Sequence, residues 1–146
     1  MKDLSILDSL ITGRVEPHIY AFTTNTIPNY LKVGDTYRPV SKRLSEWREY
    51  FPNLEQKFEG SARITDDVYF RDFAVHYFLE SEKHRTRLAE TDLPEGVYYS
   101  REFFREATVG DVEEAITDIN DDYHSKTGRY HYYDAKTQLP TTEKYA

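Results

Sequence analysis

Residues 18–44 read HIYAFTTNTIPNYLKVGDTYRPVSKRL, and this stretch decides the fold of the chain. It contains two runs of β-forming residues, 17–23 and 29–35, joined by a loop that includes Pro28 and Asn29. Apolar, β-prone runs separated by such turn residues are typical of paired strands. The pattern therefore predicts an antiparallel hairpin.

A helix is predicted directly after the hairpin, over residues 39–50. Pro39 suits the first turn of a helix, where its missing N–H would have no intrahelical partner. The apolar residues that follow recur at steps of four, three and four: Val40, Leu44, Trp47 and Phe51. This spacing predicts an amphipathic helix with one apolar face.

The hairpin and this helix bring several polar side chains close together. Tyr20 lies on the first strand, Lys32 on the second, and Arg38 and Arg43 at the start of the helix. Guanidinium and ammonium groups bind phosphate, and a phenol hydroxyl can orient a water molecule. The combination predicts a phosphodiester site, with Arg38 and Lys42 as further contacts to the substrate.

Each of these residues also has a plainer interpretation. Tyr20 is one of 13 tyrosines and could be a core residue with its hydroxyl at the edge. Lys32 could be a surface residue, and Arg38 could make no contact of consequence. Arg43 lies beside the apolar stripe of the helix rather than opposite it, which favours a role in binding phosphate.

A second helix is predicted over residues 66–82, and it is apolar on most sides, which predicts that it is buried. Asp72 and His76 interrupt it at positions i and i+4 and therefore share a face. A buried carboxylate needs a partner, which could be Arg71 or Arg63, a helix-capping contact, or a divalent cation. His76 is either a residue that orients the ligand or a hydrogen-bonded core histidine.

Shorter patterns cover the remaining middle of the chain. Alternation over residues 55–64 predicts a third strand, and the charged residues 83–95 predict a surface loop. Val97-Tyr98-Tyr99 and Glu102-Phe103-Phe104 are expected to be short strand-like pieces. Together these elements predict an α+β fold.

These motifs, in this order, resemble the GIY-YIG nuclease family, in the branch whose second signature reads K-I-G. His18-Ile19-Tyr20 stands where the family has G-I-Y, and Lys32-Val33-Gly34 stands where it has K-I-G. Arg43 matches the catalytic arginine on the family's first helix, although Trp47 stands where relatives often have His or Tyr. The resemblance covers roughly residues 17–120.

The second half of the resemblance concerns a metal site. Residues 72–76 resemble the family's E-x-x-L-H helix motif, with Asp72 in place of the glutamate, and residues 101–104 resemble its closing E-F/W-F motif. The resemblance implies Mg²⁺ or Mn²⁺ at Asp72, with His76 behind it. Glu102 is the alternative metal ligand, unless it pairs with a neighbouring arginine.

The resemblance also implies a fold and an activity. The fold is a small antiparallel three-stranded sheet flanked by helices, and the activity is metal-dependent endonucleolytic cleavage of DNA, whose phosphate backbone is bound. Tyr20 orients the attacking water, Lys32 assists it, and Arg43 neutralises charge on the phosphorus. Two alternatives remain: a catalytically silent DNA- or protein-binding module of the same fold, and a purely structural interaction domain.

The net charge of −7 excludes a uniformly basic nucleic-acid binder. Cations concentrate in residues 30–48, whereas residues 111–122 contain six acids and no cation. This acidic run belongs to a last predicted helix that begins after Thr108 as N-cap and ends near Tyr123. We expect it to face away from the basic segment, and we expect DNA binding to be weak and salt-sensitive.

Three regions are predicted along the chain: an N-terminal helix within residues 1–16, the nuclease-like domain over 17–123, and a polar tail or linker over 124–146. Such a tail fits the N-terminal part of a larger restriction- or helicase-like protein, which is an implication of the resemblance. The chain has no cysteine and no apolar run as long as a bilayer span, so we expect a cytoplasmic protein without membrane contact.

Overall fold

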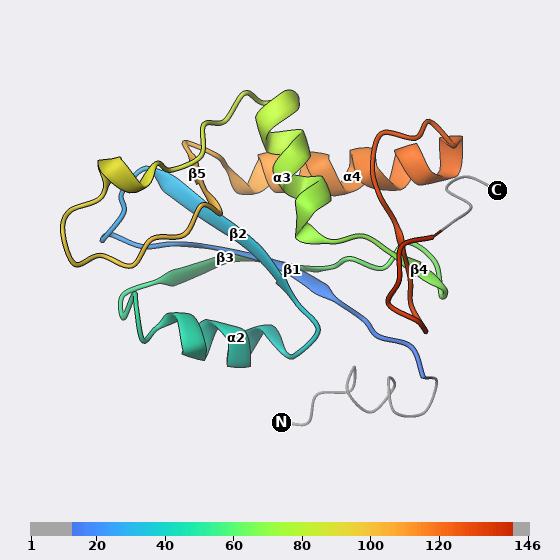
Figure 1. Cartoon of the computed structure of the whole chain (residues 1–146), viewed down its shortest axis with the longest axis horizontal. Coiled ribbons are helices and arrows are strands. Elements are labelled where there is room, and N and C mark those ends of the chain that lie inside the picture. The colour runs from blue at the N-terminus through green and yellow to red at the C-terminus, as the bar shows by residue number, and fades with distance from the viewer. Residues whose placement is uncertain (1–12, 142–146) are drawn as a thin grey trace.

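The computed structural model describes residues 13–141. Most of the N-terminal helix predicted within residues 1–16 lies outside that range. In the described part of the chain, a four-stranded antiparallel sheet is combined with three α-helices, as Figure 1 shows. The predicted α+β class is therefore confirmed. Within the same range, no helix has the length and apolar character needed to cross a membrane.

The sheet has the strand order β3–β1–β2–β5, and all neighbouring strands are antiparallel. Its strands are β1 (His18–Thr23), β2 (Tyr30–Thr36), β3 (Glu55–Ser61) and β5 (Phe103–Arg105). The predicted hairpin is confirmed as β1–β2, in which Tyr20 lies opposite Gly34. The prediction of three strands was wrong, because β5 adds a fourth along the first half of β2. Three residues suffice for β5 since Phe103 and Phe104 are both fully buried.

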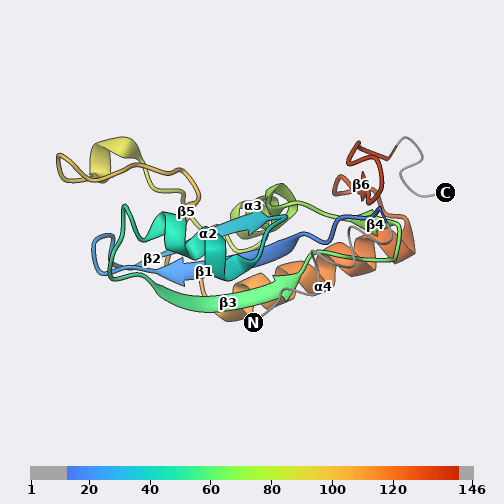
Figure 2. The same cartoon turned by 90° about the horizontal axis from the view of Figure 1, so that it is seen from below.

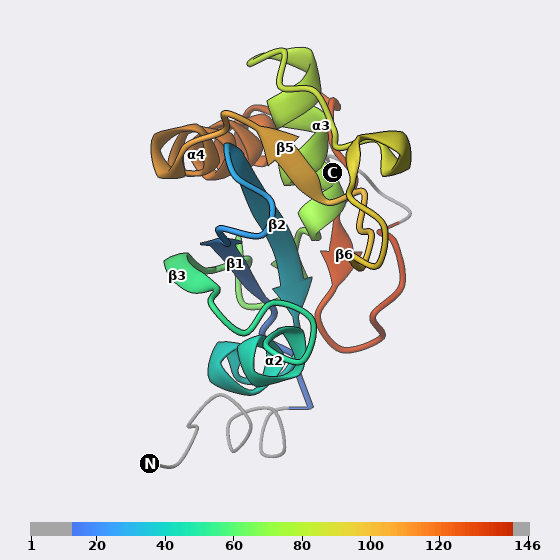
Figure 3. The ribbon, with the colours of Figure 1, turned by 90° about the vertical axis from the view of Figure 1, so that its left-hand side faces the viewer.

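The two faces of the sheet carry separate cores, because side chains alternate along each strand. Tyr20 and Phe22 pack with one helix, whereas Ile19 and Ala21 point to the opposite face and pack with the other two. Figure 3 shows α2 below the strands and α3 and α4 above them. The three helices are α2 (Val40–Trp47), α3 (Asp72–Ser81) and α4 (Val109–Ser125).

The helix predicted over residues 66–82 is shorter than expected. It begins at Asp72, and Val68–Tyr69 instead forms the short strand β4. Residues 68–70, shortly before Asp72, are apolar. A short apolar run is compatible with a buried strand as well as with a helix. The start of the helix is fixed by Asp35 of β2, because its carboxylate accepts a hydrogen bond of 2.9 Å from the Asp72 backbone N–H.

The long connection between α3 and β5 contains one 3₁₀ turn, η1 (Glu90–Asp92). The strand-like piece predicted at residues 97–99 was wrong. Tyr99 donates its hydroxyl proton to the backbone oxygen of Leu88 (3.0 Å), and Tyr98 stacks on Tyr50 with ring centroids 4.0 Å apart. The aromatic side chains of this segment thus anchor a loop rather than a strand.

Helix α4 starts as the sequence predicted. The Thr108 hydroxyl accepts a hydrogen bond from the Asp111 backbone N–H (3.1 Å), and the Asp111 carboxylate accepts one from the Thr108 N–H (3.0 Å). This reciprocal capping satisfies two N–H groups that would otherwise lack partners. Asp111 is therefore a structural residue rather than one of a row of solvated acids.

The described part of the predicted polar tail, residues 124–141, is folded onto the domain, so that prediction was wrong. Its strand β6 (Tyr133–Asp134) pairs with β4, and Tyr130 and Tyr132 are almost fully buried. The buried Asp122 carboxylate of α4 accepts a hydrogen bond of 2.6 Å from the Tyr132 hydroxyl. Figure 2 shows this segment beside β4 and the end of α4.

Candidate active site

Tyr20 and Lys32 lie side by side on the face of the sheet that α2 covers. The Lys32 Nζ atom is 3.4 Å from the Tyr20 hydroxyl oxygen. Lys32 is 0% exposed, so the interpretation of this lysine as a surface residue was wrong. A buried ammonium beside a phenol is a costly arrangement that needs compensating partners.

Gly34 leaves room for this pair. A Cβ atom at position 34 would lie 2.6 Å from the Tyr20 hydroxyl oxygen and 2.8 Å from Lys32 Nζ. Non-bonded heavy atoms do not approach so closely, so the side chains of Tyr20 and Lys32 can lie across this position only because it has no side chain. The glycine of the K-V-G motif is thus explained by packing of the two polar groups against its backbone.

Trp47 holds the tyrosine oxygen from the helix side. Its indole Nε1–H donates a hydrogen bond of 2.8 Å to the Tyr20 oxygen, and its ring lies 4.3 Å from Lys32 Nζ. A hydroxyl oxygen has two acceptor sites and one proton to donate. Trp47 and Lys32 therefore both donate to the Tyr20 oxygen and hold it in place.

Arg43 joins the same cluster from α2. Its guanidinium carbon lies 5.0 Å from the centre of the Trp47 ring, a cation–π contact. The guanidinium also interacts with the Tyr20 hydroxyl, and it remains about one third exposed. The three residues predicted to be catalytic, Tyr20, Lys32 and Arg43, are therefore brought together.

The two predicted substrate-binding residues are placed differently. Arg38 forms two hydrogen bonds, of 2.8 and 2.7 Å, with the Glu46 carboxylate, and Lys42 lies on the exposed side of α2. Glu46 also accepts a hydrogen bond of 2.9 Å from Arg43. Arg38 first and Arg43 second lower the pKa of Glu46 to about 2, so this carboxylate is charged at neutral pH.

A second group of polar residues lies next to the first. One ligand atom from each of Asp72, His76 and Glu102 lies within 4.8 Å of the others. Glu102 also binds Lys32, with 2.7 Å between Oε1 and Nζ, so it links the two groups. Asp72 and Glu102 were predicted as alternative metal ligands. Both carboxylates reach the same place, so the two residues can bind one ion together.

The plainer partners considered for these carboxylates are engaged elsewhere. Arg71 binds Asp35 rather than Asp72, with 2.6 Å between Nε and Oδ2. Glu102 binds Lys32 rather than a neighbouring arginine. The Asp72 carboxylate therefore faces another carboxylate and a histidine.

The protonation of the two carboxylates differs because of this arrangement. Burial first, and then the charges of Asp35 and Glu102, raise the pKa of Asp72 to about 8, with Lys32 opposing them. Burial also acts to raise the pKa of Glu102, but the neighbouring Lys32 outweighs it and the pKa of Glu102 is lowered. At neutral pH, and without a cation, the pair therefore carries about one proton.

His76 is buried and neutral. Burial lowers its pKa to about 4, against the opposing effect of its hydrogen bond to the backbone. Its Nε2 atom is 2.7 Å from the Val33 carbonyl oxygen. Because a carbonyl can only accept, Nε2 carries the proton and Nδ1 keeps its lone pair. A histidine that donates one ring N–H to a backbone carbonyl is typical of metal-binding histidines.

The site exists because β5 begins only at Phe103. β5 pairs with β2 only at Tyr30–Lys32, so the Val33 carbonyl oxygen is left for His76 and the following residues of β2 face α3. Asp35 then fixes α3 by accepting hydrogen bonds from both Arg71 and the Asp72 N–H. At this edge of β2, Lys32 on one face of the sheet thus lies near Asp72 on the other.

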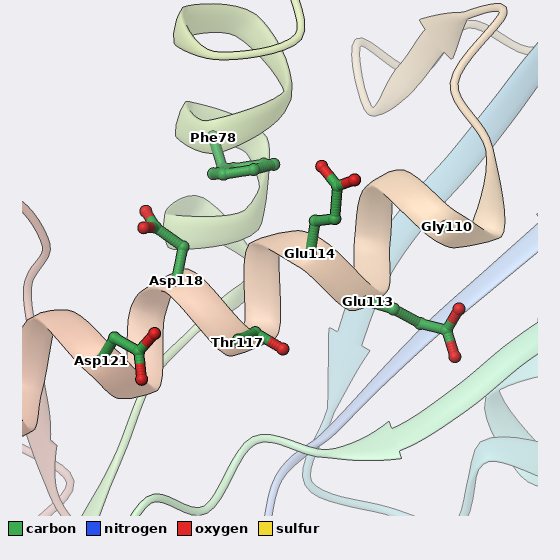
Figure 4. Close-up of a pocket in the computed structure, with 7 residues that line it drawn as sticks. All are labelled: Phe78, Gly110, Glu113, Glu114, Thr117, Asp118 and Asp121. Carbon is green, nitrogen blue, oxygen red and sulfur yellow. The ribbon is translucent and has the colours of Figure 1, made fainter.

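A separate hollow, shown in Figure 4, lies between α3 and α4. Phe78 lines it from α3, and the other side chains that line it are mainly carboxylates of α4, including Glu113, Asp118 and Asp121. Carboxylates repel phosphate, so this hollow is unsuited to a phosphodiester. Since α4 and α2 cover opposite faces of the sheet, the acidic helix faces away from the basic helix, as predicted.

Sequence reasoning missed three contributors to the site. Glu46 stands three residues after Arg43, a spacing at which helical side chains meet, so it could have been found. Trp47 was noted as an apolar residue of the stripe and as a departure from the family pattern, whereas its indole N–H binds Tyr20. The Asp35–Arg71 pair joins residues 36 positions apart, so no local sequence pattern predicts it.

Comparisons of the chain with models of protein families, with curated proteins and with solved structures found no match. The arrangement of the site residues is therefore the basis for what the site can do. That arrangement is a phenol, an ammonium and a guanidinium next to two carboxylates and an imidazole.

Proposed function

We propose that this chain is a divalent-metal-dependent endonuclease that hydrolyses phosphodiester bonds in DNA, of the GIY-YIG kind. The observation that carries the proposal is the contact between the two groups of the site: Lys32 binds both the Tyr20 hydroxyl and the Glu102 carboxylate. Cations and a hydroxyl on one side, and metal-binding groups on the other, are what hydrolysis of a phosphodiester requires.

The residues have distinct roles in this proposal. Arg43, which is about one third exposed, binds the scissile phosphate and offsets the charge that develops on it. The buried Lys32 assists by holding the Tyr20 hydroxyl together with Trp47, and Tyr20 orients the attacking water. Gly34 allows these groups to lie against the strand.

The donor set fits a divalent cation. Asp72 and Glu102 would each give one carboxylate oxygen, and His76 would give Nδ1. Ligand atoms around an octahedral cation at about 2.1 Å lie about 3 to 4 Å apart, so a small contraction of the 4.8 Å cluster suffices. The bound cation supplies charge stabilisation at the phosphate and leaving oxygen. A nitrogen among the ligands favours Mn²⁺ over Mg²⁺, which prefers oxygen alone.

A catalytically silent DNA-binding module is the second candidate, and one observation favours it. Glu46 binds both Arg38 and Arg43, so phosphate must displace an anion that is already in place. The net charge of −7 points in the same direction. An active enzyme must exchange Glu46 for a phosphate at Arg43, at least in part.

Nicking of supercoiled plasmid in Mn²⁺, in Mg²⁺ and in EDTA tests the proposal. We expect nicking in Mn²⁺, slower nicking in Mg²⁺ and none in EDTA. Manganese titrated into the protein without DNA should also bind, as detected by calorimetry. Binding of DNA at low salt without cleavage in any divalent cation would support the silent module instead. Absence of both binding and cleavage would leave the structural interaction domain.

A change at Trp47 tests how Tyr20 is held. Trp47→Phe keeps an aromatic ring beside Lys32 and Arg43 but removes the N–H donor to the Tyr20 oxygen. We expect the single-turnover cleavage rate to fall about tenfold, the value of one hydrogen bond, with DNA affinity unchanged. Tyr50→Phe, whose ring contacts Trp47 at 6.2 Å from the exposed side, is the control. Equal loss of rate and affinity would mean that Trp47 only supports packing.

A further inference from the structure

A second surface feature lies beside the candidate active site on α3. It is a groove of about 400 Å³ between the exposed side of α3 and the folded segment that follows α4. Its aromatic and basic lining is formed by Arg71, Phe73, Tyr77, Arg129, His131 and Tyr133. None of these residues has a role in the hydrolysis described above.

Two aromatic rings of this groove are unusually exposed. Phe73 is 63% exposed and Tyr77 is 53% exposed. They stand four residues apart on α3 and so present adjacent ring surfaces. A large apolar ring left in water at a groove indicates a surface that binds something.

The walls of the groove are held firmly by their own contacts. Tyr77 meets the buried Tyr130 edge-to-face, at 5.9 Å between ring centroids. Tyr133 stacks on Tyr69 at 5.6 Å. The groove is therefore preformed by the folded segment that the sequence alone suggested was a loose tail.

Positive groups flank the aromatic rings. The Arg71 guanidinium lies 5.8 Å from the Phe73 ring centre, and the Arg129 guanidinium lies 5.2 Å from the Tyr130 ring centre. Aromatic rings on which bases stack, next to cations that follow the backbone, are how proteins bind single-stranded nucleic acid. Both guanidinium groups also bind carboxylates of this chain, Arg71 that of Asp35 and Arg129 that of Asp118, which fixes their positions beside the rings.

The groove and the metal-binding cluster adjoin each other along the chain at the start of α3. Phe73 directly follows Asp72, and Arg71 directly precedes it. Asp35 binds Arg71 and the Asp72 N–H together, so the edge of the groove and the cluster are fixed to the same residue of β2. A strand whose phosphate lies at the cluster would therefore place a neighbouring nucleotide at Phe73.

We propose that this groove binds unstacked bases of a single-stranded segment adjoining the cleaved bond. The preferred substrate is then DNA with a single-stranded flap, gap or end rather than continuous duplex. This assignment rests on the proposed endonuclease function and specifies its substrate class. Phe73 and Tyr77 provide the stacking surfaces, and Arg71 and Arg129 contact the backbone.

The test uses the whole chain with Phe73→Ala and Tyr77→Ala changed together. Binding is measured by fluorescence anisotropy with labelled single-stranded, flapped and fully duplex oligonucleotides of equal length. Wild type should prefer the first two. The double variant should lose about tenfold or more in affinity for them, the effect of losing base stacking, and keep its duplex affinity.

Two further variants separate stacking from folding. Phe73→Leu with Tyr77→Leu keeps apolar side chains but removes the ring faces, and it should reproduce the loss while melting like wild type. Leu139→Ala removes an apolar side chain that is as exposed as Phe73 but does not line the groove, and it should change neither preference nor affinity.

The outcomes distinguish the groove from the proposed function. A double variant that retains the wild-type preference for flapped DNA while cleaving normally overturns the groove alone. A wild type that prefers continuous duplex also overturns it. A chain that neither binds nor cuts any DNA overturns both proposals, and capture of a protein through Phe73 would then assign the groove to a protein partner.

Discussion

Replacing Glu102 with Gln should abolish nicking in Mn²⁺ and lower Mn²⁺ affinity by about 100-fold or more. The change removes a proposed metal ligand and also the carboxylate that is 2.7 Å from the buried Lys32 ammonium. An unpaired buried charge costs about 3–5 kcal/mol of stability. We therefore expect a lower melting temperature together with the loss of activity, both measurable on the same preparation.

Asp72→Asn should also abolish nicking, but its effect on stability has the opposite sign. The folded-state pKa of Asp72 is raised to about 8, against about 4 for an unfolded aspartate. A raised pKa means that the folded protein prefers the protonated form, so the associated stability is present at low pH and is lost as pH rises through about 8. Asparagine imitates the protonated form and avoids that loss.

Melting curves at pH 6 and pH 9 without metal test this difference. Wild type should lose stability between the two values relative to Asp72→Asn, and Glu102→Gln should be less stable than either at both. Asp121→Asn, an exposed change on α4, is the control for losing one negative charge. If Asp72→Asn nicks DNA as wild type does while Glu102→Gln is inactive, Glu102 alone holds the cation.

Asp122→Ala should lower the free energy of unfolding by about 3–5 kcal/mol. Its carboxylate accepts hydrogen bonds from the Tyr132 hydroxyl (2.6 Å) and from the backbone N–H groups of Arg129 (3.0 Å) and Tyr130 (3.3 Å). Alanine leaves these buried donors without their acceptor. The melting temperature should fall by about 10 °C or more, and Asp121→Ala on the exposed side should barely change it.

Asp122 also makes the stability of the protein depend on pH. Burial acts to raise the pKa of Asp122, but the hydrogen bonds from Tyr132 and the backbone outweigh it and the pKa is lowered. A lowered pKa contributes stability that is complete above the unfolded value of about 4 and is lost as pH falls towards the folded value. Below pH 4 the gap between wild type and Asp122→Ala should therefore narrow. A gap that stays constant down to pH 2 would assign the loss to packing instead.

The parts of the fold that were predicted correctly have local signals. The β1–β2 hairpin follows from two β-prone runs around Pro28, and α2 follows from one apolar stripe. Three of the site residues, Tyr20, Lys32 and Arg43, lie on these elements and were found with them. Thr108 and its partner at Asp111 gave the start of α4 in the same way.

The parts that were missed depend on contacts between distant residues. Phe103–Arg105 is too short to be recognised as a strand, and it becomes one only because β2 offers an edge. Tyr130 and Tyr132 are buried because both bind Asp122 of α4, the first through its backbone N–H and the second through its hydroxyl. Asp72 and Glu102 could not be assigned one role from sequence, since their meeting depends on how α3 docks.

The late start of β5, at Phe103, has a consequence beyond chemistry. An unpaired strand edge attracts the edges of other molecules and promotes aggregation. Here the exposed portion of β2 is covered by side chains instead: His76 takes the Val33 carbonyl, and the Glu102 backbone oxygen takes the Val33 N–H at 3.0 Å. His76 and Glu102, which are proposed to bind metal, thus also protect this edge of β2 from pairing with a strand of another molecule. Replacing His76 would therefore free the Val33 carbonyl oxygen at this edge as well as remove a proposed metal ligand.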